Sequence, residues 1–587
     1  MINRCLGKIL KVNTYFCNYC MDHRWIIKVN PEIEKVALLS SEININPVLA
    51  SILIQRKITT FQEAKDYFRP SLENLHDPFL MEDMDLAVER LNQAIHTGEN
   101  ILIYGDYDVD GTTSVALVYS FLKKIYSNIS YYIPDRYSEG YGISREGIQW
   151  AKKNNIDLII TLDCGIKAVD MTREANEKGI DLIICDHHLP GKILPEAYAI
   201  LDPKRKECKY PYKDLSGCGV GFKFMQAFSI QNKLDPNQLN HYLDFLAVSI
   251  ASDIVPIDGE NRIFAYYGLE KLNSNPRPGL KALIDVAGLR GKVTISGIVF
   301  GIGPRINAAG RMTHAGLAVE LLLSDSYKSA EHIALKVNSN NDERRNFDSN
   351  ITTEALKMIE GDTKRKNAKS TVLYKSDWHK GVIGIVASRC IDKFYRPTVI
   401  LTKSNDKATG SARSVNGFDV YEAIAECSDL LDQYGGHMYA AGLTLSLDKV
   451  NAFIEKFEKI VAERITEEQL IPRIDIDQVI ELDIITAKFL EILKQMAPFG
   501  PYNMQPIFMS ENLYVSSRPR ILKQEHLKFY VHQEGNDAVL ETIGFGLAQY
   551  FELINSGMRF KMAYAIDENN YMGHTTIQLL AKDIKFD

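Results

Sequence analysis

Residues Ile101 to Gly111 read Ile-Leu-Ile-Tyr-Gly-Asp-Tyr-Asp-Val-Asp-Gly, an apolar run followed directly by acidic residues. The apolar run is typical of a buried strand, and we expect a helix over residues 111–125. Like charges as close as Asp106, Asp108 and Asp110 repel one another unless protons or cations neutralise them, so a bound divalent cation is one interpretation. The other is a solvated acidic turn in which Asp110 caps the helix.

The alternation of apolar strands and amphipathic helices continues beyond this segment. We expect strands at 131–133, 158–160 and 182–184, and helices at 144–153 and 167–178. Such an order predicts a parallel sheet with helices on both faces, and sites in these sheets form at the carboxyl ends of the strands.

Candidate ligands follow two of the later strands as well. One strand ends in Thr161-Leu162-Asp163-Cys164-Gly165 and the next in Cys185-Asp186-His187-His188, while Asp253 ends an apolar helix over 245–252. A purely structural explanation requires a separate cap or partner for each, because burial of an unpaired charge is costly. One shared site accounts for all of them.

Carboxylate and imidazole ligands without clustered thiolates favour Mn²⁺ or Mg²⁺ over a structural zinc. A pair of such ions activates water and neutralises charge on a phosphoryl group. We therefore expect a two-metal site that hydrolyses a phosphoester or a phosphoanhydride.

The pattern along the chain predicts an α/β protein with two α/β domains joined by a long helix and followed by a small β-barrel. In the second α/β domain we expect strands at 372–374 and 398–401 with a helix at 382–393. The expected divisions are an N-terminal extension and lead-in subdomain of short helices at 1–95, a catalytic domain at 96–312, a connecting helix at 313–360, the second α/β domain at 361–465 and the barrel at 466–587.

Composition limits the classes of protein to consider. A chain of 587 residues with 45% hydrophobic residues is large enough for several cores. The net charge of -7 means that any nucleic-acid binding must use local basic surface. No run reaches the roughly 18 apolar residues of a membrane span, and nine scattered cysteines are typical of reduced thiols, so we expect a cytoplasmic protein.

We interpret Cys17 and Cys20 as incidental thiols rather than a zinc site, and expect Met21 to be the natural start.

Four motifs in this order, GDYDVDG, TLDCG, CDHH and AVSIASDIVP, resemble the RecJ branch of the DHH phosphoesterase superfamily. The resemblance continues through residues 303–311. Beyond them WHKGVIG (378–384), GSARS (410–414) and GGH (435–437) resemble the DHH-associated substrate-binding domain. The C-terminal region is similar to an oligonucleotide-binding (OB) domain, so the resemblance covers nearly everything after residue 21.

The resemblance implies a catalytic metal site. Its metal ligands would be Asp108, Asp110, Asp163, His187 and Asp253, with Asp163 bridging the ions. Many relatives carry a histidine where this chain has Tyr104, so Asp106 is expected to complete one coordination sphere. His188 and Asp186 would contact substrate or orient the ligands.

Several other residues are candidates for binding substrate. Arg305, Arg311, Ser411 and Arg413 lie in glycine-rich stretches where they can reach a phosphate, and Asn307 is counted with them; a surface salt bridge is the alternative for each arginine. Gly435, Gly436 and His437 form either a phosphate cradle or a plain turn. Arg136 could hold a terminal phosphate and Tyr141 could stack on a base, although core packing of the tyrosine explains it equally well.

These features predict a metal-dependent exonuclease that hydrolyses single-stranded DNA in repair and recombination. Degradation from the 5′ end to mononucleotides is implied by the resemblance alone. We expect a monomer without membrane contact whose partners are single-stranded DNA and a helicase or single-strand-binding protein. One alternative is a DHH phosphodiesterase of short oligoribonucleotides or cyclic dinucleotides, which would lack the barrel. The other is a non-catalytic DNA-binding scaffold, which would lose ligands.

Overall fold

The computed structural model describes residues 23–571 and 574–586. The expectations for Cys17, Cys20 and Met21 lie outside these residues. The chain divides into two compact units, and each is described by itself. The first unit comprises Lys65–Arg345 and Met496–Met504; the second comprises the residues up to Ala64, Asn346–Gln495 and the residues from Gln505 onward. The segment expected as one lead-in subdomain is therefore divided between the units at Ala64.

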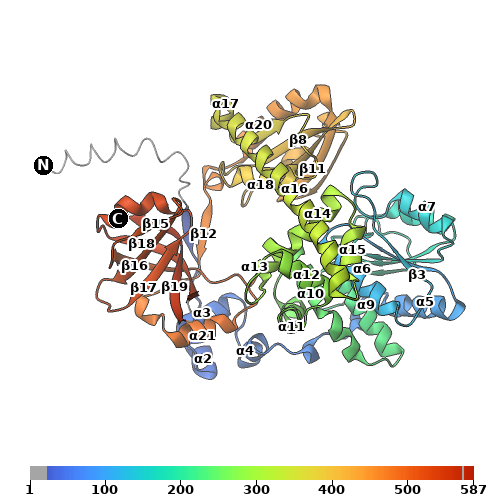
Figure 1. Ribbon diagram of the computed structural model, residues 1–587, viewed down its shortest axis with the longest axis horizontal. Helices are drawn as coiled ribbons and strands as arrows, with labels where there is room; N and C mark the ends of the chain where they lie inside the picture. The colour runs from blue at the N-terminus through green and yellow to red at the C-terminus, as the bar shows by residue number, and fades with distance from the viewer. Residues whose placement is uncertain (1–22, 572–573, 587) are drawn as a thin grey trace. The chain divides into compact units, whose positions relative to one another are not determined.

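The first unit contains a parallel five-stranded sheet in the order β3-β2-β4-β5-β6 (Figure 1). Its strands are β2 (Ile101–Gly105), β3 (Ile129–Tyr132), β4 (Leu158–Leu162), β5 (Asp181–Cys185) and β6 (Ala199–Leu201). The expected strands and the parallel sheet are confirmed. β6 was not anticipated, because three residues are too few to show a period.

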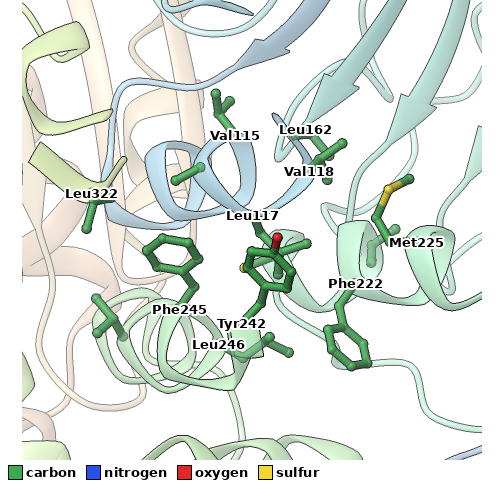
Figure 2. Close-up of a cluster of buried hydrophobic side chains, with 14 of the residues drawn as sticks. Val115, Leu117, Val118, Leu162, Phe222, Met225, Tyr242, Phe245, Leu246 and Leu322 are labelled. Carbon is green, nitrogen blue, oxygen red and sulfur yellow. The ribbon is translucent and has the colours of Figure 1, made fainter. Parts of the chain in front are cut away.

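Helices cover both faces of this sheet, as predicted. Alternate residues of β2 point to opposite faces, so Ile103 packs in the core with α6, α9 and α10, whereas Leu102 packs with α7 and α8. Figure 2 shows part of the larger core, to which α6 contributes Val115, α9 contributes Phe222 and α10 contributes Phe245. The helices of this unit are α5 (Met84–Thr97), α6 (Val109–Leu122), α7 (Arg145–Lys153), α8 (Val169–Glu177), α9 (Gly217–Gln231), α10 (Leu243–Asp253), α11 (Gly259–Ser274), α12 (Pro278–Val286), α13 (Ile295–Gly297), the π-helix η4 (Ile298–Ile302), α14 (Gly303–Met312) and α15 (Gly316–Leu322).

The connecting helix expected over 313–360 is two helices in the structure. After α15 the chain turns, and α16 (Tyr327–Glu360) begins. The break falls at Ser324-Asp325-Ser326, residues whose side chains compete for backbone hydrogen bonds and favour turns and caps.

The second unit contains the other expected α/β sheet, in the order β10-β11-β9-β8-β7. Only β7 and β8 are parallel. The elements are α17 (Thr363–Asn367), β7 (Thr371–Tyr374), α18 (Ile383–Ile391), β8 (Thr398–Ser404), β9 (Lys407–Arg413), α19 (Val420–Ala425), β10 (Gln433–His437), β11 (Ala440–Ser446) and α20 (Val450–Arg464).

The C-terminal strands form the expected barrel. Their order is β13-β14-β18-β19-β17-β16-β15, and a further pairing of β14 with β16 closes the ring. At the other end of the chain, β1 (Arg24–Ile27) pairs in parallel with β12 (Arg473–Ile476). The remaining elements are α2 (Ile33–Ile43), α3 (Pro47–Gln55), α4 (Phe61–Phe68), β13 (Gln478–Val479), α21 (Ala487–Gln495), β14 (Phe508–Val515), β15 (Arg520–Leu522), β16 (His526–Gln533), β17 (Val539–Gly544), α22 (Phe551–Asn555), β18 (Phe560–Tyr571) and β19 (His574–Phe586).

Within the described residues, no single helix has the length and apolar composition to cross a membrane; one sharply bent pair, α2 with α3, passes that test jointly.

Candidate metal centre

The register of the parallel sheet brings three acidic residues to one edge. Gly105 of β2 lies beside Leu162 of β4, which lies beside Cys185 of β5. The residue after each of these is an aspartate: Asp106, Asp163 and Asp186. Since parallel strands end at the same edge of a sheet, the three carboxylates emerge side by side.

The predicted ligands meet around His187 and Asp163. His187 Nε2 lies 3.2 Å from Asp163 Oδ1, 3.6 Å from Asp253 Oδ2 and 3.8 Å from Asp110 Oδ2. Groups of three residues place their ligand atoms within 4.8 Å of one another: Asp106, Asp108 and Asp163; Asp110, His187 and Asp253; and Asp163, His187 and His188. Asp163 and His187 each belong to two of the three groups, and of these two side chains only the carboxylate of Asp163 has a second oxygen with which to bind a second ion.

Burial and mutual repulsion disfavour charge on these carboxylates. Burial, followed by the neighbouring aspartates, raises the pKa of Asp106, Asp108, Asp163 and Asp253. Burial also lowers the pKa of His187, so its imidazole is neutral and able to bind a metal.

Several buried ligand atoms have no hydrogen-bond partner among the residues that the structure describes. They are Asp106 Oδ1, Asp163 Oδ1 and both ring nitrogens of His187. An unpaired buried polar atom costs about 1–3 kcal/mol, so this cluster requires a further partner. Oxygen and imidazole donors without thiolates suit Mn²⁺ or Mg²⁺, and the site therefore fits the divalent cations expected from the sequence.

Neighbouring backbone groups hold Asp108 and Asp110 in place. Asp108 caps α6 by accepting a hydrogen bond from Gly111 N at 3.0 Å. The interpretation of Asp110 as the cap is therefore wrong. Asp110 lies in the first turn of α6 and accepts hydrogen bonds at 2.7 Å from Gly217 N and at 2.9 Å from Cys218 N, the first residues of α9. The amino end of a helix stabilises a carboxylate in this position.

The backbone at Asp163 is strained and tightly packed. Its φ is 62°, a left-handed conformation that is uncommon outside glycine, although aspartate and asparagine adopt it more readily than other residues. Gly217 approaches it so closely that a Cβ there would lie 2.7 Å from the Asp163 Cβ. Unusual backbone of this kind is concentrated at functional sites, where surrounding packing holds it in place.

Asp186 orients the two histidines. It accepts hydrogen bonds from His188 Nδ1 at 2.7 Å and from the backbone N–H groups of Ile166 and His187. Burial alone would raise the pKa of Asp186, but these hydrogen bonds and the His188 charge lower it. Burial disfavours charge on His188 as well, yet the bond to Asp186 raises its pKa to about 9. His188 is therefore a cation at neutral pH, beside the candidate metal ligands.

Tyr141 extends from the metal centre toward solvent. Its hydroxyl donates to the Asp163 carbonyl at 3.2 Å, its ring lies edge-on to His188, and it is 56% exposed. Core packing, the alternative for this residue, does not describe so exposed a ring. Tyr104, in contrast, is buried and its hydroxyl bonds to Gly142 O and Ser144, so it fixes the loop before α7 and is not among the clustered ligands.

Among the candidate phosphate-binding residues of the first unit, Arg136 lies over the Tyr107 ring at 4.7 Å. Arg311 accepts a hydrogen bond at its carbonyl from Tyr137, and Asn307 lies on α14 between Arg305 and Arg311. Arg305 is different: its guanidinium is buried and donates to Asn338 Oδ1 and Gly301 O, both at 2.8 Å. A structural role explains these bonds directly, and a phosphate contact by Arg305 stays a prediction.

The second unit carries the other candidates. Ser411 and Arg413 lie on β9, with Arg413 Nη1 3.0 Å from Ser411 Oγ, and a Cβ on Gly384 of α18 would lie 2.8 Å from both side chains. Gly435, Gly436 and His437 are exposed and belong to the edge strand β10, so a plain turn does not describe their backbone; phosphate binding by these residues stays a prediction. At Gly436 φ is 147° and a Cβ would contact Ala440 O at 2.4 Å, so only glycine fits.

Three residues around the site were not anticipated from the sequence: Ser216, Ser249 and Asp202. Ser249 of α10 donates to Asp110 at 2.7 Å and bonds to Ser216, the cap of α9. Asp202 follows β6 and is buried, and burial raises its pKa to about 7. The pair Leu201-Asp202 repeats the strand-then-aspartate signal of the other strands, so Asp202 was detectable; Ser249 was not.

Three family models match successive parts of the chain. They are the DHH family N-terminal domain at residues 100–250, the DHHA1 domain at 367–463 and the RecJ OB domain at 476–583. The acidic edge of the parallel sheet lies within the first match, so fold and site define a metal-binding hydrolase of the DHH class, built with a DHHA1 domain and an OB domain.

Relatives of known name match almost the whole chain. The single-stranded-DNA-specific exonuclease RecJ of Bacillus subtilis is 37% identical, over 95% of this chain and 70% of its own length. The same enzyme of Escherichia coli is 31% identical over 94% of this chain and 98% of its length. The chain therefore belongs to the RecJ family of single-stranded-DNA-specific exonucleases.

A solved structure agrees with this assignment. RecJ of Thermus thermophilus in complex with Mn²⁺ superposes with a TM-score of 0.82 at 25% identity, covering 96% of this chain and 80% of that one. A second RecJ structure bound to manganese has a TM-score of 0.59 at 31% identity, covering 68% of this chain and 98% of that one. Both carry a metal of the type that the donor set here favours.

Proposed function

We propose that this chain is a metal-dependent exonuclease that hydrolyses the phosphodiester bonds of single-stranded DNA. The observation that carries the proposal is the meeting of Asp106, Asp108, Asp163, His187 and Asp253 at one sheet edge, with ligand atoms left unpaired. The family assignment supplies the substrate. A DHH phosphodiesterase of short oligoribonucleotides or cyclic dinucleotides is not favoured, because this chain has the barrel. A non-catalytic scaffold is not favoured, because the chain retains every acidic position.

The chain's own residues perform separate tasks. Asp106, Asp108, Asp110, Asp163, His187 and Asp253 would hold two Mn²⁺ or Mg²⁺ ions. When bound, the ions activate water and neutralise charge on the phosphoryl group. Asp186 fixes the imidazole of His188 and the backbone of His187, and the cationic His188 lies where it can bind a phosphate oxygen or give a proton to the leaving oxygen.

We propose that the remaining candidates bind the strand. Arg136, Tyr141, Asn307 and Arg311 would contact it from the first unit, and Ser411, Arg413, Gly435, Gly436 and His437 from the second. The division into catalytic (96–312), substrate-binding (361–465) and barrel (466–587) segments is part of the same proposal.

Further features are proposed by family resemblance: cleavage from the 5′ end to mononucleotides, a role in repair and recombination, a monomeric state, and a helicase or single-strand-binding protein as partner. The buried free thiols of Cys164, Cys185, Cys218 and others support a reducing compartment, which we propose is the cytoplasm.

The test compares single-stranded DNA, duplex DNA, RNA and a cyclic dinucleotide, each with Mn²⁺, Mg²⁺ or chelator, using substrates labelled at either end. Wild type should release labelled mononucleotides from single-stranded DNA only when metal is present. Asp163→Ala should remove this activity with an unchanged circular dichroism spectrum. Asp170→Ala, at an aspartate whose side chain is 82% exposed on α8, is the matched control and should cut normally. Equal cleavage of duplex DNA, or activity retained by Asp163→Ala, would contradict the proposal.

A further inference from the structure

A short turn from the C-terminal part of the sequence is built into the first unit. Residues Met496–Met504 belong to that unit although the segments on either side belong to the second. Gly500 and Asn503 exchange backbone hydrogen bonds of 3.0 and 2.8 Å, so Pro501 and Tyr502 occupy the two central positions of a tight turn.

Buried polar groups fix this turn. The Arg262 guanidinium donates to the carbonyls of Met496 at 3.1 Å and Ala497 at 3.0 Å. Asn503 donates to the carbonyls of Met496 at 3.0 Å and Pro498 at 2.7 Å, and accepts a hydrogen bond of 2.8 Å from the Tyr67 hydroxyl. So many satisfied hydrogen bonds make the turn a rigid platform.

The turn lies close to the metal centre along the chain. Ile257 N donates to Pro501 O at 2.8 Å, and a Cβ on Gly500 would lie 2.6 Å from the Ile257 side chain. Ile257 lies four residues beyond Asp253, and a fully extended chain of four residues spans at most about 14 Å. Tyr502 is therefore within reach of a strand whose end lies at the metals.

The conformation of Tyr502 is unusual for a surface residue. Its φ is 62°, which glycine or asparagine adopts at lower cost, yet its ring is 78% exposed. Neither packing nor backbone preference accounts for an aromatic side chain at this place. A strained residue on a rigid support points to a role outside the fold.

Neighbouring segments add a second aromatic ring and two cations. Phe300, on the π-helix η4, is 81% exposed. Leu289 packs beneath η4 at Gly301, and Ile295, at the start of α13, approaches Gly500. Arg290 and Lys292 lie on the same loop as Leu289, are exposed, and form no ion pair among the described residues. Aromatic rings interleaved with free cations are typical of single-strand binding surfaces.

We propose that Tyr502, with Phe300, stacks on bases of the DNA strand a few nucleotides from the metal centre, while Arg290 and Lys292 contact its phosphates. This inference rests on the proposed function and adds to it a base-stacking platform on the catalytic unit itself, separate from the barrel. Stacking on a ring is tolerant of sequence, as a nuclease without sequence preference requires.

The test measures binding of a fluorescent oligonucleotide to full-length protein in the Asp163→Ala background, which does not cut it. Tyr502→Gly removes the ring and relieves the backbone, whereas Tyr502→Phe keeps the ring. We expect Kd to rise about tenfold for Tyr502→Gly and to change less than about twofold for Tyr502→Phe. The thermal midpoint of Tyr502→Gly should equal or exceed that of the parent, which excludes unfolding as the cause.

A set of oligonucleotides, each with one abasic residue at a different position, separates stacking from other effects. The parent protein, which carries only Asp163→Ala, should bind more weakly when the abasic residue is at one or two particular positions. With Tyr502→Gly added, an abasic residue at those positions should cause no further loss of affinity. Identical abasic profiles and affinities for the two proteins would overturn the inference while leaving the nuclease intact. Failure of the parent to bind any single strand would overturn the proposed function and this inference with it.

Discussion

Gly217→Ala should reduce activity without removing any ligand. The added Cβ would lie 2.7 Å from Asp163 Cβ and 2.9 Å from its Oδ1, whereas carbon atoms in contact are about 3.5–4.0 Å apart. Asp163 cannot easily retreat, because its amide is bonded to Cys185 O at 2.9 Å and its φ is already 62°. The ligand or the start of α9 must therefore move by about 1 Å, and a misplacement of that size can cost about 10²-fold in rate.

The assay is steady-state release of nucleotides from single-stranded DNA, together with thermal unfolding. We expect kcat to fall about 10²-fold and the free energy of unfolding to fall by about 1–3 kcal/mol, as for other overpacked sites. Gly219→Ala on the same helix is the control, because its Cβ would meet only Leu215 at 3.3 Å and Ser216. Wild-type kcat in Gly217→Ala would refute the argument that Asp163 is held at a fixed position.

Three further predictions concern stability and binding. Since burial and repulsion raise the folded pKa values of the site carboxylates, the folded metal-free protein binds more protons than the unfolded chain. Its thermal midpoint should therefore fall as pH rises above the ordinary titration range of aspartate, and saturating Mn²⁺ should flatten this slope. Ser249→Ala removes a hydrogen bond to Asp110, so calorimetry should show Mn²⁺ affinity weakened about tenfold, and unchanged affinity would contradict the positioning role. In Arg305→Lys the lysine cannot reach both acceptors of the guanidinium, Asn338 Oδ1 and Gly301 O, so the free energy of unfolding should fall by about 1–3 kcal/mol while KM stays nearly unchanged. A raised KM at constant stability would instead indicate phosphate binding by Arg305.

The local sequence pattern was sufficient to predict the parallel sheet and the acidic residues at its edge. The apolar run Ile101–Tyr104 and the acidic residues directly after it can be recognised from neighbouring residues alone. The strand-end rule then places Asp106 and Asp163 together. Asp253 was found by a different signal, a charged residue ending an apolar helix.

Contacts between distant segments could not be inferred in this way. Ser249 reaches Asp110 across 139 positions in the chain, and nothing in either local sequence announces the bond. Tyr502 is a second example. Its turn belongs to the first unit, whereas the chain segments on either side of the turn belong to the second. β10 was missed because its glycines suggest a turn, whereas pairing with β11 makes it a strand. Tertiary context overrides local preference in both cases.

We propose that one edge of the sheet would hold two divalent cations, with Asp163 among the ligands of both. Titration of chelator-treated protein with Mn²⁺ by isothermal calorimetry tests it most directly. We predict two bound ions per chain, with at least one lost in Asp163→Ala. A single ion, or none, in the wild type, or the same number in both proteins, would contradict it.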